Sequence, residues 1–465
     1  MDELVVELPI SPARLGPLHD WTVREDLDGR LTPDRHFYYR FVYDGVPSRI
    51  GRLRTLPKPD AAIERLRLGV LSCQDYARGY FNAPGELAAE DVDYLLHLGD
   101  FVYETLPPLP VHADRWLELP SGQPIAMGLG DFRTIHRAYR SDPMLQRALE
   151  RHTLIAIWDD HEIANDRYWD AEESRARAPD HPLDADPITS TIMTAGGVRA
   201  WYEYMPARVR YDAGSASLRD RIRVERSFRF GSLAEIYLTD DRLRRDAHPC
   251  GETRADRFNK AASACPARTA AGRSMLDDAQ RQWLIDGLAS STAQWKLWGN
   301  SVPLTSIGYG FGGKRIFLTL DTWAGFAAER RTILAELARR GVENLVSLAG
   351  DMHTFFAASL HLGEPRESRL PGKALGVELG FGAVTAPSLQ SLAPALCEED
   401  LVRENNPQIG LWKPGVHGAA ILELTRDVLE CEIRECSIER RAQRPARKVA
   451  GRVRVASGVA EVESV

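Results

Sequence analysis

The chain has 465 residues, of which 44% are hydrophobic and 27% are charged, and its formal net charge at pH 7 is −7. This length and composition fit a globular protein with a sizeable core, built as one large domain with an appendage. The negative charge argues against a nucleic-acid-binding surface, which is usually basic, and no apolar run reaches the roughly 20 residues of a membrane-spanning helix.

Residues 1–58 are predicted to form a small β-rich module. Polar and apolar side chains alternate imperfectly over residues 35–44, and a turn leads from there to a second candidate strand at 49–55. The pair suggests a β-hairpin, and the two prolines within residues 56–59 are typical of a linker. The chain begins with an acidic segment that lacks a signal-peptide pattern. We therefore expect a cytoplasmic protein, or an exported one if the sequence starts inside a longer precursor.

From residue 59 onward the pattern changes to that of a larger α/β domain. Apolar strand-like segments alternate there with two helical patterns, at 131–151 and 276–288. This alternation favours a layered α/β core. Further strands are expected at residues 233–238, 295–298, 419–424 and 428–433.

Two segments outside this pattern are expected to be exposed. Residues 170–186 are acidic and contain proline, which favours a surface loop. Residues 439–465 are expected to form a solvated C-terminal tail, rather than an RNA-binding patch, because of a run of basic residues: Arg440, Arg441, Arg444 and Arg447.

Three apolar segments end abruptly in residues that can bind metal ions. Residues 154–157 lead into the sequence WDDHE at 158–162, residues 94–98 lead to Asp100 and Tyr103, and residues 345–349 lead to Asp351 and His353. Charged side chains at the end of a buried strand are costly unless a metal cluster or a salt-bridge network pairs with them. Because side chains alternate along an extended segment, Asp351 and His353 point to the same side. Three such strand ends predict an active site.

The chemistry of these groups indicates which metals they would hold. A further strand ends at Cys73, whose thiolate is a strong metal ligand, although a buried cysteine is often only a small apolar side chain. Asp100 can bridge two cations or merely cap a helix, and Tyr103 can bind a hard metal ion as a phenolate. Asp160 and Asn165 can add oxygen ligands. Oxygen-rich sites suit calcium, magnesium or manganese, whereas a corner of Tyr, Cys and His favours iron.

Taken in chain order, these motifs resemble those of the PhoD-like alkaline phosphatase D family of metallophosphatases. The resemblance is specific, because many separate segments along most of the chain agree with it. Those segments are 72–74 with Gly79 and Tyr80, 99–103, 139–143, 158–162 with Asn165, 298–300, 321–323 and 350–353, followed by Glu378, Asn406, Pro407, His417 and Gly418. Residues 38–41 and 48–51 also resemble the end of the family's N-terminal β-sandwich, although the predicted module is too short for the whole of it.

The resemblance implies a four-layer α/β/β/α metallophosphatase sandwich, with residues 59–438 as its catalytic domain, related to the purple acid phosphatases. It also implies a cluster of ferric iron and calcium at the strand ends, where other divalent metals are compatible. The implied iron ligands are Cys73, Asp100, Tyr103 and His353. The implied calcium ligands are Asp100, Asp160, Asn165 and Asp351.

The activity that the resemblance implies is hydrolysis of a small-molecule phosphate ester by metal-activated water. His161 is expected either to stabilise the transition state or to protonate the leaving oxygen. Arg140 is expected to hold a non-bridging oxygen unless it forms a structural ion pair. Asp159 and Glu162 are expected to have structural roles. The expected substrate-binding residues are Asn300, Asp321, Trp323 and His417.

Several alternatives stay open at this point. A phosphodiesterase or a phospholipase D-like enzyme fits the same motifs, and a non-catalytic relative that binds phosphate ligands is the alternative of another class. Intact ligands at every strand end favour an enzyme over a binding protein. Cys250 and Cys265 bracket a polar loop and either pair or are two unrelated thiols. The sequence favours no particular oligomeric state.

Overall fold

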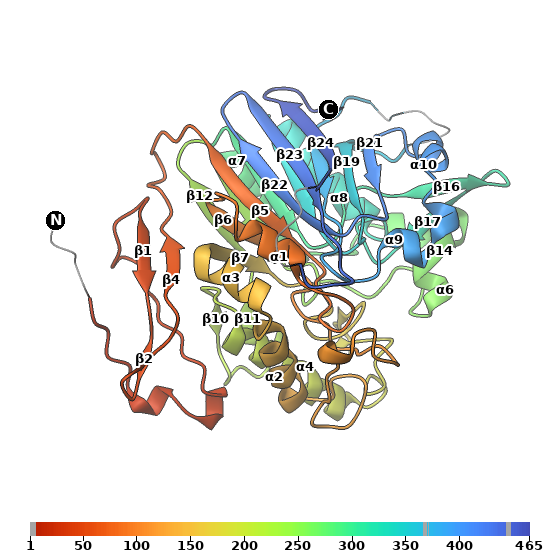
Figure 1. Cartoon of the computed structure of the whole chain (residues 1–465). Helices are drawn as coiled ribbons and strands as arrows, with labels where there is room; N and C mark the ends of the chain where they lie inside the picture. Colours follow the sequence, from red (N-terminus) through yellow and green to blue (C-terminus); the bar gives the residue numbers. More distant parts are fainter. Residues whose placement is uncertain (1–5, 366–369, 371, 443–447) are drawn as a thin grey trace.

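The computed structural model describes residues 6–365, 370, 372–442 and 448–465. Over these residues two seven-stranded sheets pack face to face, and helices lie on their outer faces (Figure 1). Each sheet buries one face against the other sheet, which is the usual reason for a layered architecture. The predicted four-layer α/β/β/α sandwich is confirmed.

The first sheet joins the early strands of the sandwich to the C-terminal part of the chain. Strands β5, β6 and β7 run parallel, so that their carboxyl ends meet at one edge of the sheet. The other strands extend the sheet in antiparallel pairs. In order, the strands are β25 (Glu463–Ser464), β24 (Lys448–Ala456), β23 (Val428–Glu435), β22 (Gly418–Leu424), β5 (Leu66–Leu71), β6 (Tyr94–Leu98) and β7 (Thr153–Ile157).

The second sheet has a parallel centre and antiparallel edges. Strands β13, β15, β18 and β20 are parallel to one another, so their carboxyl ends also share one edge. In order, the strands are β12 (Arg226–Phe230), β13 (Ala234–Leu238), β15 (Trp295–Asn300), β18 (Leu345–Ala349), β20 (Gly376–Gly380), β19 (Phe355–Leu360) and β21 (Ile409–Lys413).

The second sheet is buried on both of its faces. Leu297 of β15 belongs to the apolar core between the sheets, whereas its neighbour Trp298 belongs to the cluster beneath α7 (Asp277–Ser290) and α8 (Ala327–Arg339). Successive strand residues point to opposite faces. A strand of this sheet therefore packs apolar side chains on both of its faces. This explains why polar and apolar residues do not alternate in the sequence of such strands.

The helical pattern at residues 131–151 forms two helices, so the prediction of one helix was wrong. Pro143 lacks a backbone N–H and begins a second helix, and the side chain of Asp142 caps that helix by accepting hydrogen bonds from the backbone N–H groups of Met144 and Leu145. The helices of this layer are α1 (Asn82–Leu87), α2 (Leu129–Arg140), α3 (Pro143–Arg151) and α4 (Pro187–Tyr204).

The C-terminal segment also differs from its prediction. Strand β24 pairs with β23 along its length and buries Val453 and Val455, so these residues extend the first sheet and do not form a solvated tail. The alternation of arginine and valine at 452–455 marks a strand with one buried face. Arg440 and Arg441 are exposed, whereas Arg444 and Arg447 lie outside the described residues.

The N-terminal module is a pair of short two-stranded ribbons that stands beside the sandwich (Figure 1). Asp44 and Gly45, with φ angles of 49° and 75°, form the hairpin turn, where two left-handed residues match the twist of the strands. The backbone N–H of Arg54 donates to the hydroxyl of Thr153 and thereby connects the ribbons to the sandwich. The strands are β1 (His36–Tyr39), β2 (Val42–Tyr43), β3 (Val46–Pro47) and β4 (Gly51–Arg54).

Smaller elements complete the described chain. Cys250 and Cys265 form a disulfide beside the three-stranded sheet β14-β17-β16. No helix of the described residues is both long enough and apolar enough to cross a membrane. The remaining elements are β8 (Tyr168–Asp170), β9 (Arg175–Arg177), β10 (Arg210–Tyr211), β11 (Ile222–Arg223), β14 (Phe258–Ala261), β16 (Gly308–Phe311), β17 (Lys314–Thr319), α5 (Leu218–Arg221), α6 (Arg254–Arg257), α9 (Leu389–Leu392) and α10 (Glu399–Asn405).

Candidate metal centre

The loops that leave the carboxyl ends of β5, β6 and β18 turn sharply at four of the predicted ligands. Cys73, Asp100, Asp351 and His353 have φ angles of 55°, 55°, 63° and 52°. Left-handed backbone is uncommon for residues other than glycine, and it recurs at sites where a side chain must be aimed in a fixed direction. The two sheets thus direct their strand-end side chains toward one place.

Four side chains with sulfur, nitrogen and oxygen donors converge at this place. Cys73 Sγ, a carboxylate oxygen of Asp100 and a ring nitrogen of His353 all lie within 4.8 Å of one another. The hydroxyl of Tyr103 lies 2.9 Å from Asp100 Oδ2 and 3.1 Å from His353 Nε2. These are the four residues for which the resemblance implies iron, and strands of both sheets contribute them.

Their protonation also fits a metal site. His353 Nδ1 is 2.7 Å from the carbonyl oxygen of Pro387, which leaves Nε2 facing the cluster. Burial lowers the pKa of His353 to about 4, so the ring is neutral, as a metal ligand must be. Burial also raises the pKa of the Cys73 thiol well above its ordinary value. A nearby cation would reverse that effect and stabilise the thiolate.

A group of carboxylates continues the cluster on the side of β7. Oxygens of Asp159, Asp160 and Asp351 lie within 4.8 Å of one another, and Asp100 and Asp160 form a similar group with His161. Burial, reinforced by Asp159, holds the pKa of Asp351 well above its ordinary value. Several buried carboxylates at such distances repel one another, and a bound cation is the usual means of relieving the repulsion.

A buried arginine that the sequence analysis missed neutralises part of this charge. Arg242 is fully buried and forms ion pairs with Asp159, with Asp321 at 2.5 Å and with Asp351 at 3.1 Å. Both carboxylate oxygens of Asp159 accept from this guanidinium, which agrees with a structural role for Asp159. The strand ends therefore contain both a candidate metal cluster and a salt-bridge network.

Glu162 supports the backbone around the cluster. Its carboxylate accepts hydrogen bonds from the backbone N–H groups of Asp100, Phe101 and Asp159, at 2.8–3.1 Å. The structure thus places Glu162 behind the loops, where it holds the end of β6 against the end of β7. This position agrees with the structural role that we expected for Glu162.

His161 lies at the open side of the cluster and is paired with a second missed residue, Glu104. Nδ1 of His161 is 2.7 Å from Glu104 Oε2, and the ring lies 4.2 Å from that of Tyr103. Burial alone would lower the pKa of His161, but Glu104 and Asp160 outweigh burial and raise it well above its ordinary value. A protonated imidazole at this position can donate to an oxygen of a bound phosphate.

The two predicted asparagines follow or end strands of the sandwich, Asn165 in the loop after β7 and Asn300 beside the end of β18, and they differ in their contacts. Asn165 donates its side-chain amide to Asp180, at 2.7 Å, and its backbone N–H to Glu104. Asn300, at the end of β15, accepts from the indole N–H of Trp323, and its buried Nδ2 has no hydrogen-bond partner in the described part of the chain. The unpaired amide of Asn300 is therefore a candidate contact for a bound group.

Three predicted residues have positions that do not match their expected roles. Arg140 points away from the cluster, because its guanidinium donates to Met205 Sδ at 3.4 Å and lies over the ring of Phe101, so it does not hold a phosphate oxygen here. Trp323 is fully buried and cannot line a substrate mouth. His417, in contrast, lies beside the loop that holds His353, since its Nε2 is 2.9 Å from the carbonyl oxygen of Ala386.

Asp321, the third of these residues, belongs to an ion-pair network. Its carboxylate pairs with Arg242, Arg245 and His248 at 2.5–2.6 Å. Burial alone would raise the pKa of Asp321, but the two arginines hold it well below its ordinary value. A carboxylate with three cationic or donor partners has little capacity left for a substrate, so the structure does not support Asp321 as a substrate-binding residue.

The chain is similar to known phosphatases in sequence and in fold. The model of the family described as PhoD-like phosphatase matches residues 68–433. Alkaline phosphatase D of Bacillus subtilis (strain 168) is 28% identical over 391 residues, which cover 83% of this chain and 62% of that protein, so the chain spans less than two thirds of this relative. A solved structure, entitled "Structure of PhoD", superposes with a TM-score of 0.78 at 24% identity and covers 94% of this chain and 78% of its own.

Proposed function

We propose that this chain, which belongs to the PhoD-like phosphatase family, hydrolyses small-molecule phosphoric esters in a metal-dependent reaction. The observation that carries the proposal is the convergence of Cys73, Asp100, Tyr103 and His353, within hydrogen-bonding or ligand distance, at the carboxyl ends of strands from both sheets. A purely structural ion-pair network has no need of a thiol, a phenol and a neutral imidazole around one carboxylate.

The donor types support two kinds of metal ion. The corner of Cys73, Tyr103 and His353 suits ferric iron, and the carboxylates of Asp160 and Asp351 suit calcium or another hard divalent ion, with Asp100 between the two. When bound, these ions would polarise the phosphoryl oxygens and lower the pKa of a water molecule. Asn165 remains a candidate calcium ligand if its amide leaves Asp180.

His161 is the residue of this chain that we propose to act on the proton of the leaving group. Its ring lies at the open side of the cluster, and Glu104 holds Nδ1, so that Nε2 remains available to a bound ester. Donation of a proton to the leaving oxygen would avoid the release of an unstable alkoxide. Asn300 and His417 remain proposed contacts of the substrate, because Asn300 pairs with Ala349, at the end of the strand that leads to Asp351, and His417 lies beside the loop that holds His353.

The decisive experiment measures hydrolysis of a panel of phosphate monoesters and diesters by the purified, metal-stripped chain before and after metals are added back. The proposal predicts that activity returns with iron and calcium together, and that Asp100→Asn abolishes it. Asp286→Asn, which changes an exposed carboxylate of α7, serves as the control and should retain full activity. Absence of hydrolysis of every ester by the metal-loaded chain would contradict the proposal and favour a binding protein.

A further inference from the structure

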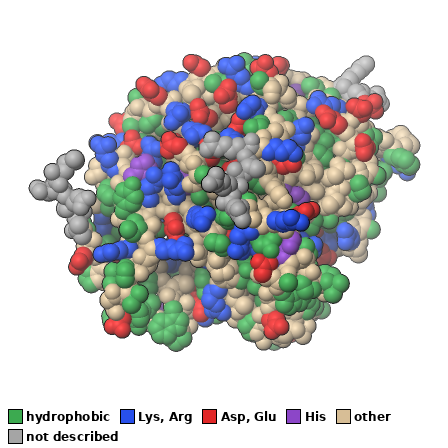
Figure 2. Space-filling model, viewed as in Figure 1, with side chains coloured by type: hydrophobic (Ala, Val, Ile, Leu, Met, Phe, Trp, Pro, Cys, Tyr) green, Lys and Arg blue, Asp and Glu red, His purple; other side chains and the backbone are tan. Residues whose placement is uncertain are grey.

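The ribbons of residues 36–54 expose an unusual number of large apolar side chains. We refer to these residues as the apolar ribbon. Isolated exposed apolar residues are common on proteins, whereas a contiguous group usually marks an interaction surface. Figure 2 shows hydrophobic side chains gathered at the lower left of the molecule, where Figure 1 places β2. The exposed fractions are 71% for Tyr38, 41% for Tyr39, 45% for Phe41, 60% for Val42, 67% for Tyr43, 70% for Val46 and 61% for Ile50.

The apolar ribbon is also basic, in a chain whose net charge is negative. Residues 36–54 contain four arginines and one carboxylate, that of Asp44. Arg54 pairs with Asp34 and Asp93, and Arg49 pairs with Glu150 at 2.9 Å. The remaining arginines of this segment have no carboxylate partner among the residues that the structure describes. Apolar side chains and unpaired guanidinium groups therefore share one surface.

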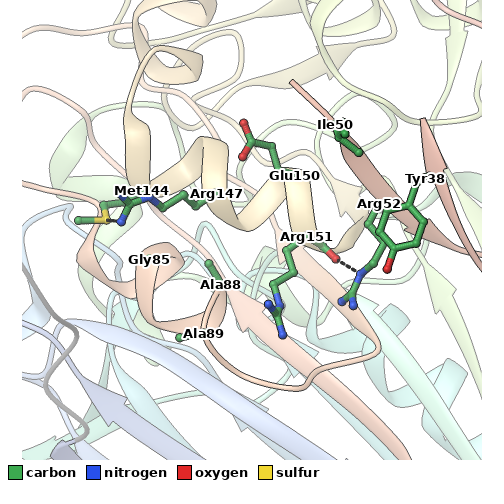
Figure 3. Close-up of a pocket in the computed structure, with 10 residues that line it drawn as sticks. All are labelled: Tyr38, Ile50, Arg52, Gly85, Ala88, Ala89, Met144, Arg147, Glu150 and Arg151. Carbon is green, nitrogen blue, oxygen red and sulfur yellow. Dashed lines mark hydrogen bonds between the residues drawn. The ribbon is translucent and has the colours of Figure 1, made fainter. Parts of the chain in front are cut away.

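A hollow beside the apolar ribbon adds two more arginines. It measures about 490 Å³ and lies between β1, β4 and the helices α1 and α3 (Figure 3). Arg52, Arg147 and Arg151 line it, and the one acidic residue in its lining, Glu150, is the partner of Arg49. Arg52 Nε donates to the carbonyl oxygen of Arg151 at 2.8 Å, and among the residues that the structure describes its terminal nitrogens have no hydrogen-bond or ion-pair partner (Figure 3).

We infer that the apolar ribbon and this hollow form a docking surface for an anionic lipid bilayer. Tyrosine, phenylalanine and valine side chains can enter the interfacial region of a bilayer, where tyrosine is favoured. Arginine stems pack along apolar surface while their guanidinium groups reach the phosphates of lipid headgroups. Basic residues are attracted to negatively charged membranes. The hollow, lined by Arg52, Arg147 and Arg151, would receive a headgroup phosphate.

Charge complementarity favours a bilayer over a second copy of this chain. A symmetric contact through the apolar ribbon would bring Arg40 and Arg52 of both copies close together, and like charges at a desolvated contact are unfavourable. An anionic bilayer instead supplies a counter-charge to every guanidinium. The inference goes beyond the proposed function, because docking on a bilayer requires neither metal ions nor turnover.

The test is co-sedimentation of the full chain with vesicles of phosphatidylcholine and with vesicles that also contain phosphatidylglycerol. We expect binding to the mixed vesicles, weaker binding as salt is raised, and little binding to phosphatidylcholine alone. The double variant Phe41→Ser with Tyr43→Ser, and the triple variant Arg52→Gln, Arg147→Gln and Arg151→Gln, should each reduce binding by about tenfold or more. Matched controls are Phe311→Ser, which is 76% exposed elsewhere, and Arg331→Gln.

Several outcomes would overturn the inference. They are absence of binding to either type of vesicle, equal binding to both types, and binding that neither set of substitutions weakens. Light scattering of the wild-type chain provides a separate check. If it shows a dimer that Phe41→Ser with Tyr43→Ser dissociates, the apolar ribbon is an interface between copies and the inference fails. Hydrolysis of a soluble phosphate ester, measured in parallel, reports on the proposed function independently.

Discussion

Nδ1 of His161 lies 2.7 Å from Oε2 of Glu104, and the other carboxylate oxygen of Glu104 accepts a hydrogen bond from the backbone N–H of Asn165 at 2.9 Å. This buried carboxylate thus fixes both the ring of His161 and the loop that follows it. Fixing one ring nitrogen determines which nitrogen faces the cluster. Glu104, in the loop after β6, consequently connects that loop with His161 and Asn165 in the loop after β7.

The first prediction concerns Glu104. Glu104→Ala should lower kcat by about tenfold to a hundredfold while KM changes little, because general acid catalysis usually contributes factors of this size or more. The loss should be larger for an alkyl phosphate than for p-nitrophenyl phosphate, whose leaving group needs no proton. Glu104→Gln retains a hydrogen-bond acceptor and should recover part of the activity. Equal losses for the two esters would contradict this role.

The second prediction concerns the buried charge of Arg242. Arg242→Met leaves Asp159, Asp321 and Asp351 without their shared cation, and removal of one partner of a buried ion pair costs about 3–5 kcal/mol. Urea unfolding of the metal-free chain measures this loss. The matched control is Arg339→Met, whose ion pair with Glu336 is exposed to solvent, so that its loss should lower the free energy of unfolding far less. Similar losses of unfolding free energy in the two variants would show that Arg242 stabilises the fold no more than an exposed arginine does.

The third prediction concerns stability in acid. His136 is buried, its ring stacks on Tyr204 at 5.1 Å, and neither ring nitrogen has a hydrogen-bond partner in the part of the chain that the structure describes. Burial lowers the pKa of His136 from 6.5 to about 3. Between these values the unfolded chain binds a proton that the folded chain does not, so the free energy of unfolding declines as the pH falls through this window.

His136→Phe keeps the stacked ring and removes the titration. The urea midpoint should therefore fall less between about pH 7 and about pH 5 in the variant than in the wild type. The comparison of the two midpoints at each pH provides the measurement. A decrease of the same size in both proteins would mean that His136 is not responsible for the acid sensitivity.

The fourth prediction concerns Arg140. Because its guanidinium faces Met205 and Phe101, Arg140→Met should leave KM for a phosphate ester within about twofold of the wild-type value. Steady-state kinetics of the variant and the wild type test this expectation. A large rise in KM without loss of stability would return Arg140 to the substrate-binding role that its position in the sequence suggested.

The strand ends were predictable because each candidate ligand follows directly after an apolar run. Asp100, Asp160 and Asp351 can each be identified from the segment that precedes them. Because β5, β6 and β7 are parallel, the strand ends that lead to Asp100 and Asp160 lie at the same edge of the sheet. Arg242 and Glu104 were not predicted, because their importance depends on partners that are distant in the sequence. Asp159 and Arg242, for example, are 83 positions apart.

Two further differences between the predicted and the observed structure have a signal in the sequence, and a third does not. Pro143 marks the boundary between α2 and α3, since proline is favoured in the first turn of a helix. The alternation of Arg452, Val453, Arg454 and Val455 marks an amphipathic strand, yet the nearby arginines suggested a solvated tail. Arg140 was assigned by its motif, and only the direction of its side chain shows that it faces the interface of α2 and α4.

Anomalous diffraction from a crystal of the iron- and calcium-loaded chain is the sharpest test of the proposed metal centre, because it locates bound metal without reference to activity. We expect an iron peak bounded by Cys73, Asp100, Tyr103 and His353, and loss of that peak in Cys73→Ser crystals. The absence of metal between these four side chains, or its binding only at the ion-pair network around Asp321, would contradict the account.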